Sequence, residues 1–314
     1  MADTGTDISI ARGLLQRGEL VAIPTETVYG LAGNALNVDS VAKIFEVKNR
    51  PSFDPLIVHI HDFKELSKYV MNVPVPAERL AKAFWPGPLT LLLRKRNNIP
   101  DLVTAGLDTV GIRCPNHPLT QNLLKTIDFP LAAPSANPFG FVSPTKASHV
   151  TEQLGNKIRY VLDGGPSTIG IESTIVGFEN NKPVIHRLGG VSVEQLESVV
   201  GDIEVVTSPT ALKSPGQLKS HYSPTKKMFM ADLEKTVGLV DLDRVALLSF
   251  RKDFNAKSQV ILTPTGDLTE AAKNLFDALR RLDKMPVDLI LAEFVPDEGI
   301  GRAINDRLRR ASAK

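Results

Sequence analysis

Cysteine is almost absent from this chain, because Cys114 is the only one among 314 residues. A single cysteine excludes an internal disulfide framework and any cysteine-based zinc or iron–sulfur cluster, and it fits a reducing compartment. No stretch approaches the ~18 consecutive apolar residues that a membrane span needs. Residues 1–6 show no basic region followed by an apolar stretch, so we expect a cytoplasmic protein without a membrane anchor.

An excess of charge of either sign is also lacking. Lys and Arg number 37 against 35 for Asp and Glu, and the net charge of +2 is far below the surplus of a dedicated nucleic-acid coat. Any anion-binding site must therefore be local. The signatures G-x-x-x-x-G-K-[ST], H-E-x-x-H and G-x-S-x-G do not occur, nor does G-x-G-x-x-G after a strand. A P-loop ATPase, a zinc protease and a conventional dehydrogenase are thus poorly supported.

The composition that remains is that of a globular protein, with 42% hydrophobic and 23% charged residues, and the length favours two domains. Up to about Val200, strand-like segments and helices alternate irregularly, which predicts an α/β domain with a partly antiparallel sheet. Beyond residue 225, short apolar runs interleaved with a helix predict a small parallel sheet. The predicted division is 1–201 for the first domain, 202–224 for a Pro- and Ser-containing linker, and 225–314 for the second domain.

Two polar motifs follow buried strand-like segments. Residues 24–31 (Pro-Thr-Glu-Thr-Val-Tyr-Gly-Leu) bring hydroxyls, a carboxylate and a phenol to a strand end, where α/β sheets bind ligands. The alternative is an ordinary turn with Thr25 or Thr27 as a helix cap. Residues 133–137 (Ala-Pro-Ser-Ala-Asn), followed by 143–145 (Ser-Pro-Thr), suit an anion-binding turn, although Ser and Asn occur in any loop.

Cations mark two further motifs. Lys48 and Arg50 lie two residues apart on what we expect to be an exposed corner after a helix, where they can bind neighbouring phosphate oxygens. Solvated basic residues at a helix C-terminus are the simpler explanation. Arg187 lies inside an apolar strand and needs a partner there, either a phosphate or the carboxylate of Glu172.

Taken in order, these motifs resemble those of the YrdC/YciO family. The resemblance rests on six features: 24–31, 48–50 with 55–59, Gly111-Ile112-Arg113, 134–137 with 143–145, 172–174, and 186–190. The linker and the ending at 301–311 are similar to those of the family's long, two-domain form. Asp54 departs from the pattern, since Asn usually stands there, and Gln217 replaces a typical Met.

The resemblance implies a YrdC-like domain with a twisted mixed sheet, followed by a small Rossmann-like parallel α/β domain. It also implies a nucleotidyltransferase that joins L-threonine, bicarbonate or CO2, and ATP into threonylcarbamoyl-AMP and pyrophosphate. That product would pass to the tRNA threonylcarbamoyl-transfer machinery for t6A modification. The carbamate itself attacks the α-phosphate, so no protein nucleophile is needed, and Mg2+ is expected as a bridging ion with ATP.

The family's functional residues carry over to matching positions of this chain. Those implied to bind ATP are Lys48, Arg50, Asp54, Thr109, Ser135, Asn137, Ser143, Arg187 and Tyr222, with Lys48 and Arg50 as the catalytic pair. Those implied to bind threonine are Thr27, His59, Arg113, Ala133, Ser173 and Thr174. An arginine such as Arg113 can fork to the substrate carboxylate. No protein-built metal site is expected.

The segment 214–224 (Ser-Pro-Gly-Gln-Leu-Lys-Ser-His-Tyr-Ser-Pro) is unusually marked for a linker. We expect it to close over the cleft, with Tyr222 reaching the nucleotide, although a passive tether is the alternative. A different class of function stays open: a double-stranded RNA-binding module of the same fold, or weak RNA binding beside the synthase activity. A carbamoyl-handling accessory domain is a third interpretation.

Overall fold

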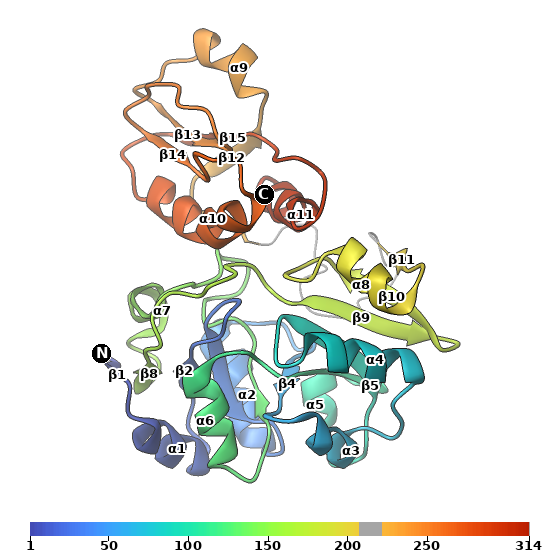
Figure 1. Ribbon diagram of the computed structural model, residues 1–314. Coiled ribbons are helices and arrows are strands. Elements are labelled where there is room, and N and C mark those ends of the chain that lie inside the picture. The colour runs from blue at the N-terminus through green and yellow to red at the C-terminus, as the bar shows by residue number, and fades with distance from the viewer. Residues whose placement is uncertain (207–221, 314) are drawn as a thin grey trace. The chain divides into compact units, whose positions relative to one another are not determined.

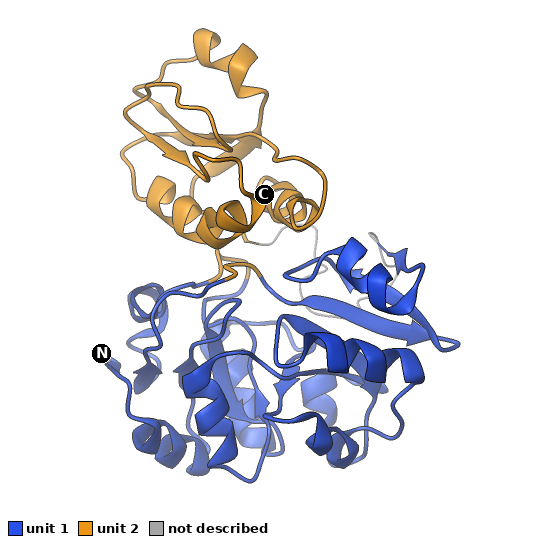
Figure 2. Cartoon of the chain, in the orientation of Figure 1, with its two compact units in different colours: residues 1–139, 144–168, 172–217 blue, residues 140–143, 169–171, 218–314 orange. Residues whose placement is uncertain are grey.

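A computed structural model describes residues 1–206 and 222–313, which form two compact units (Figure 2). As far as described, unit 1 comprises residues 1–139, 144–168 and 172–206, and unit 2 comprises residues 140–143, 169–171 and 222–313. Unit 2 therefore includes two short segments that precede the predicted linker. Within that linker, residues 204–205 pair in the sheet of unit 1, whereas residues 207–221 lie outside the described part of the chain.

Unit 1 is built on one mixed sheet of 11 strands among the described residues (Figure 1). In spatial order the strands are β1 (Asp3–Gly5), β8 (Tyr160–Leu162), β2 (Val21–Ile23), β3 (Gly30–Asn34), β7 (Leu131–Ala132), β4 (Ile57–His59), β6 (Thr109–Arg113), β5 (Leu89–Arg94), β9 (Thr174–Glu179), β10 (Lys182–Arg187) and β11 (Glu204–Val205). Parallel pairs such as β4 with β6 stand beside antiparallel pairs such as β5 with β6. The expected mixed sheet is confirmed.

The helices of unit 1 flank this sheet. They are α1 (Ile8–Gln16), α2 (Val38–Lys48), α3 (Leu66–Tyr69), α4 (Val75–Phe84), α5 (Asp101–Thr104), α6 (Pro118–Lys125), α7 (Ala147–Leu154) and α8 (Val193–Val200), with a 3-10 turn η1 at Phe63–Glu65. The side chain of Asn37 caps the start of α2, and Asn49 ends it in the left-handed conformation at φ 51°. Asn tolerates that conformation, so the chain turns sharply between Lys48 and Arg50.

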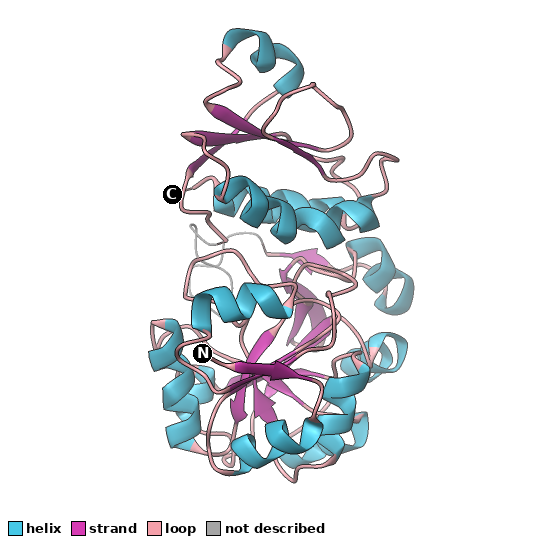
Figure 3. Ribbon diagram, turned by 90° about the vertical axis from the view of Figure 1, so that its left-hand side faces the viewer, coloured by secondary structure: helices cyan, strands magenta, loops and turns pink. Residues whose placement is uncertain are grey.

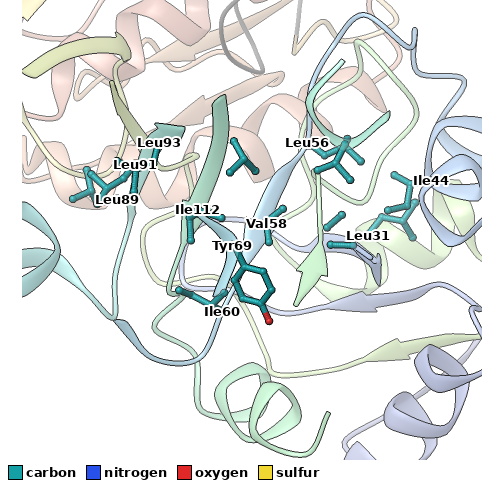
Figure 4. Packing of buried hydrophobic residues seen from close by; sticks show 14 of the residues in the cluster. Leu31, Ile44, Leu56, Val58, Ile60, Tyr69, Leu89, Leu91, Leu93 and Ile112 are labelled. Carbon is teal, nitrogen blue, oxygen red and sulfur yellow. The ribbon is translucent and has the colours of Figure 1, made fainter. Parts of the chain in front are cut away.

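The central strands present different chemistry on their two faces. Leu89, Leu91 and Leu93 of β5 pack with Val58 and Ile112 in the main core (Figure 4). Because side chains alternate along a strand, the residues between them point to the opposite face. That face has a smaller apolar cluster of Ile57, Leu92 and Ile175, and it also carries Thr90, His59 and Arg113. The candidate functional side chains therefore gather away from the main core.

Unit 2 is a four-stranded parallel sheet with helices, which confirms the expected small parallel α/β domain. Its strands are ordered β12 (Lys227–Met230), β15 (Leu289–Ala292), β13 (Val245–Ser249) and β14 (Gln259–Ile261). The helices are α9 (Leu233–Thr236), α10 (Leu268–Asp283) and α11 (Gly301–Ala311), with a 3-10 turn η2 at Val237–Leu239. Figure 3 shows α10 and α11 along one face of the sheet. No helix in the described ranges is long and apolar enough to cross a membrane.

Candidate active site

Lys48 is the last residue of α2, and its side chain turns into the protein. The ammonium donates hydrogen bonds to the backbone carbonyls of Ser135, at 2.5 Å, and of Asn137. Lys48 is 1% exposed and Arg50 is 8% exposed, so the expectation of an exposed corner is wrong. A buried cation needs oxygen partners, and the turn at 135–137 supplies them. Two motifs that are 87 residues apart in the sequence are thereby joined.

Arg50 is held by the segment that follows it. Its Nε donates to the carbonyl of Asp54 at 3.1 Å, and its Nη2 donates to the carbonyl of Pro55 at 2.9 Å. The carboxylate of Asp54 forms an ion pair with the same Nη2 at 2.9 Å, and both side chains are buried. The ring of Phe139 lies 5.8 Å from the guanidinium carbon. Asp54, the departure from the family pattern, is thus an internal counter-ion for Arg50.

Burial dominates the titration of this cluster. Desolvation lowers the pKa of Lys48 well below its usual value, and the charge of Arg50 lowers it further. Burial raises the pKa of Asp54, although Arg50, Lys48 and Arg187 each act in the opposite direction. The Asp54 carboxylate thus forms an ion pair with Arg50 and also feels the positive charges of Lys48 and Arg187. Such a local concentration of positive charge suits a polyanion, in a chain whose net charge is close to zero.

Arg187 is placed at the end of β10 against the residues that lead into β9. Its Nε and Nη2 donate to the carbonyl of Ser173 at 3.1 and 2.9 Å, and Nη2 also donates to the Ser173 hydroxyl at 3.1 Å. That hydroxyl lies 2.8 Å from the hydroxyl of Thr90 on β5. The sequence suggested a phosphate or Glu172 as the partner, and the structure adds Ser173. Ser173 therefore links Arg187 to the central strands.

Arg113 ends β6 and is surrounded by three protein oxygens. Its Nη2 forms an ion pair with Oε1 of Glu26 at 2.7 Å, its Nη1 donates to the hydroxyl of Thr27 at 2.8 Å, and its Nε donates to the carbonyl of Gly87 at 3.3 Å. The Thr27 hydroxyl also lies 2.8 Å from that of Thr25. The predicted threonine-binding residues Thr27 and Arg113 are thus in direct contact.

His59 lies beside Arg113 because the register of β4 and β6 makes the two residues neighbours. The imidazole is buried, and burial lowers its pKa to about 3, with a further contribution from the positive charge of Arg113. His59 is therefore neutral at physiological pH. A neutral imidazole beside the guanidinium can exchange hydrogen bonds with a substrate without repelling an ammonium group.

Other predicted site residues occupy different positions in unit 1. Thr109 begins β6, at the opposite end of that strand from Arg113. Ala133 follows β7, and its N–H donates to the carbonyl of Ile57 at 3.0 Å. The Thr174 hydroxyl donates to the carbonyl of Val191 at 2.6 Å and accepts from its N–H at 3.0 Å, so it ties β9 to the loop before α8. Ligand contacts by these three residues stay predictions.

Ser143 and Tyr222 belong to unit 2. The carbonyl of Ser143 accepts a hydrogen bond from Arg280 at 3.4 Å. Tyr222 is 1% exposed, its ring stacks on Phe276 with centroids 5.5 Å apart, and the guanidinium carbon of Arg307 lies 5.2 Å from its centroid. The contacts expected between these residues and a nucleotide stay predictions. Residues 214–221 of the expected closing segment lie outside the described part of the chain.

Glu26 and Thr90 are the polar residues at this site that the sequence analysis gave no role. Glu26 was visible as the carboxylate of the 24–31 motif. Arg113, like Arg187, ends an apolar strand, so the cost of desolvating its guanidinium also predicts an acidic partner for it. No feature of the sequence indicated Thr90 as a site residue, because a single threonine within an apolar strand is common.

Two family models match consecutive parts of the chain. The model Sua5_yciO_yrdC, described as "Telomere recombination", matches residues 13–189, and the model Sua5_C, described as "Threonylcarbamoyl-AMP synthase, C-terminal domain", matches residues 191–313. The chain therefore belongs to the Sua5/YciO/YrdC family, in its two-domain form. This membership confirms the resemblance that the six motifs carried.

Named relatives share nearly the whole length. The protein named threonylcarbamoyl-AMP synthase of Pyrococcus abyssi is 41% identical over 97% of this chain and 94% of its own. Its namesake from Bacillus subtilis is 42% identical over 97% of this chain and 92% of its own. The crystal structure of P. abyssi Sua5 complexed with L-threonine has a TM-score of 0.93 at 39% identity, and covers 99% of this chain and 97% of that one.

The buried imidazole of His59 predicts an acid sensitivity of unit 1. Its pKa is about 3 when folded and ~6.5 when unfolded. Between these pH values the unfolded state binds a proton that the folded state does not. The contribution of His59 to the free energy of unfolding is therefore fully present above pH 6.5 and is lost as the pH falls toward 3. Denaturant unfolding of wild type and His59→Gln should be followed through Trp85, the only tryptophan. The wild-type free energy of unfolding should fall more steeply, by up to about 1.4 kcal/mol per pH unit. Equal slopes for the two proteins contradict the assignment.

Proposed function

We propose that this protein is an L-threonylcarbamoyladenylate synthase of the nucleotidyltransferase class. It joins L-threonine, bicarbonate or CO2, and ATP into threonylcarbamoyl-AMP and pyrophosphate, and its product serves t6A modification of tRNA. The observation that carries the proposal is that unit 1 contains two separate groups of buried polar side chains. In the first, Lys48, Arg50 and Arg187 each lower the pKa of Asp54. In the second, Arg113 donates a hydrogen bond to Thr27. Similarity to relatives with the synthase name, over 97% of the chain, supports it.

The cation cluster is the proposed site of the ATP phosphates. Lys48, Arg50 and Arg187 would counter the charge that develops on the triphosphate as pyrophosphate leaves. Ser135 and Asn137 would add hydrogen bonds from the turn that already holds Lys48. Mg2+ is expected to arrive with ATP and to be held largely by phosphate oxygens. Among the residues that the structure describes, no group of three or more His, Cys, Asp or Glu could hold a metal ion.

Arg113 is the proposed receptor of the threonine carboxylate, with Thr27, His59 and Ser173 around the rest of the amino acid. A guanidinium matches a carboxylate with two parallel hydrogen bonds. The crystal structure of a 39% identical Sua5 complexed with L-threonine supports this substrate. Catalysis would come from position: the enzyme would hold the threonine carbamate in line with the α-phosphate of ATP and exclude competing water.

A double-stranded RNA-binding module is less well supported. The net charge of +2 is small, and the cations of unit 1 named above are buried rather than spread over a surface. A tRNA-modifying partner protein would instead receive the small-molecule product. Ligands that bind only the folded state raise its melting temperature, so ATP with Mg2+ and threonine should stabilise the protein more than duplex RNA does.

Pyrophosphate release from ATP tests the proposal directly. We expect release to depend on both L-threonine and bicarbonate, because the attacking carbamate needs both. Omission of either should lower the rate to the background of ATP hydrolysis, and threonylcarbamoyl-AMP should appear in equal amount to pyrophosphate. Release that is independent of threonine, or pyrophosphate without the adenylate, rules out the synthase reaction.

Arg50→Ala should lower kcat/KM at limiting ATP by at least about tenfold, because it removes charge matched to the transition state. The substitution also leaves the buried carboxylate of Asp54 without its counter-ion. The double variant Arg50→Ala/Asp54→Asn removes that carboxylate and should recover stability but not activity. The exposed Arg12→Ala serves as the control. Recovery of activity in the double variant would show that Arg50 is structural.

Arg113→Lys should weaken binding of threonine more than binding of ATP. A lysine keeps the positive charge but cannot form two parallel hydrogen bonds to a carboxylate. Titration calorimetry with each ligand measures the two effects separately. The matching change at an exposed position, Arg94→Lys, should leave both affinities unchanged. Equal losses for threonine and ATP would mark Arg113 as a structural arginine.

A further inference from the structure

Glu26 is a buried carboxylate whose hydrogen-bonding capacity is unused. Its side chain is 5% exposed, and its Oε1 lies 2.7 Å from Nη2 of Arg113. No donor in the described part of the chain gives either carboxylate oxygen a hydrogen bond of normal geometry. A buried carboxylate is stabilised by several donors when its role is only structural, and an unsatisfied one is costly. The site is therefore incomplete on the side of Glu26.

Arg113 has N–H donors that the protein itself does not use. A guanidinium carries five N–H groups, and in Arg113 only Nε and Nη1 each donate one hydrogen bond of normal geometry to a protein oxygen. Nη2 contacts Oε1 of Glu26 as an ion pair and donates no such hydrogen bond, so N–H groups of Nη1 and Nη2 remain for a ligand. Arg113 and Glu26 lie side by side, so the same small region offers donors to a carboxylate and acceptors to an ammonium. An α-amino acid carries those two groups on one carbon atom.

We propose that Glu26 binds the α-ammonium group of threonine and accepts its proton, which makes Glu26 a catalytic residue. The inference rests on the proposed function, because it names the group that prepares the amine for carbamate formation. Threonine would thus be held at both ends of its zwitterion, by Arg113 at the carboxylate and by Glu26 at the nitrogen. The carboxylate of Glu26 would gain the hydrogen bonds that it lacks.

The protons of this step balance. Glu26 takes one proton from the ammonium and leaves a neutral amine, and the protonated Glu26 gives that proton to the hydroxyl of bicarbonate, which leaves as water and releases CO2. The amine nitrogen then forms a bond to the carbon of CO2, and the second nitrogen proton passes to Glu26 and on to solvent. The resulting carbamate oxygen attacks the α-phosphate, and the bond from that phosphorus to pyrophosphate breaks.

The titratable neighbours of Glu26 besides Arg113 do not compete for this role. Cys114 follows Arg113, and burial raises the pKa of its thiol to about 11. His117 directly precedes α6, and burial lowers the pKa of its imidazole from 6.5. Both groups are neutral between pH 7 and 8.5. A difference between the pH profiles of Glu26→Gln and wild type in that range therefore reports on the substrate amine and its acceptor, because the two proteins share every other titratable group.

A binding comparison separates an amine receptor from a structural partner of Arg113. The probes are L-threonine and 3-hydroxybutanoate, which keeps the carboxylate and hydroxyl but has no amine. Wild type should bind threonine at least about tenfold more tightly, and Glu26→Gln should abolish that preference while binding 3-hydroxybutanoate as wild type does. If Glu26 were purely structural, Glu26→Gln would weaken the binding of both ligands equally, because both use Arg113. Glu26→Asp, which keeps the charge, should retain the preference even if Glu26→Gln does not fold.

Turnover tests the proton transfer. At saturating threonine, Glu26→Gln should lower kcat by at least about a hundredfold, and its kcat should rise with pH between 7 and 8.5, because more threonine then arrives already deprotonated. An unchanged kcat in Glu26→Gln overturns the inference. So does an equal loss of affinity for L-threonine and 3-hydroxybutanoate in Glu26→Gln, together with no preference for threonine in Glu26→Asp. Wild type that makes threonylcarbamoyl-AMP in those experiments keeps the proposed function intact. If the wild-type protein binds no threonine, both the proposed function and the inference about Glu26 are wrong.

Discussion

Buried cations need oxygen atoms, and unit 1 is organised around that requirement. Four cationic side chains sit inside it, and each donates to at least one backbone carbonyl. Lys48 uses Ser135 and Asn137, Arg50 uses Asp54 and Pro55, Arg113 uses Gly87, and Arg187 uses Ser173. Each carbonyl belongs to a segment that follows or precedes a strand. The cations therefore fix the conformation of the loops that border the site, as well as supplying its charge.

The sheet supplies the other half of this arrangement. Its central strands bury leucine, isoleucine and valine on one face, so the polar residues of the same strands share the other. His59 and Arg113 meet only because β4 and β6 are parallel neighbours in register. Thr90 of β5 is opposite Arg113 in the next pair, so its hydroxyl reaches Ser173. Three strands that are well separated in sequence thus contribute one site.

Sequence reasoning identified residues of this candidate site, but not how they are arranged. Lys48, Arg50, Arg113 and Arg187 are recognisable from their motifs, and short apolar runs predicted the parallel sheet of unit 2. The pairing of Arg113 with Glu26 depends on strand order, which no local pattern contains. The burial of Lys48 depends on a turn 87 residues away. Segments 140–143 and 169–171 are too short for a pattern to assign them to unit 2.

The burial of Lys48 has a consequence for the thermodynamics of any anion that binds there. Desolvation favours the neutral amine, whereas a phosphate next to the nitrogen favours the ammonium. Binding of a polyanion therefore raises the pKa of Lys48, and whatever fraction of the amine is neutral in the free protein takes up a proton from the buffer. A buffer must release that proton, so its heat of ionisation enters the enthalpy that a calorimeter records. Titrations in HEPES and in Tris would then report different enthalpies for one and the same binding event.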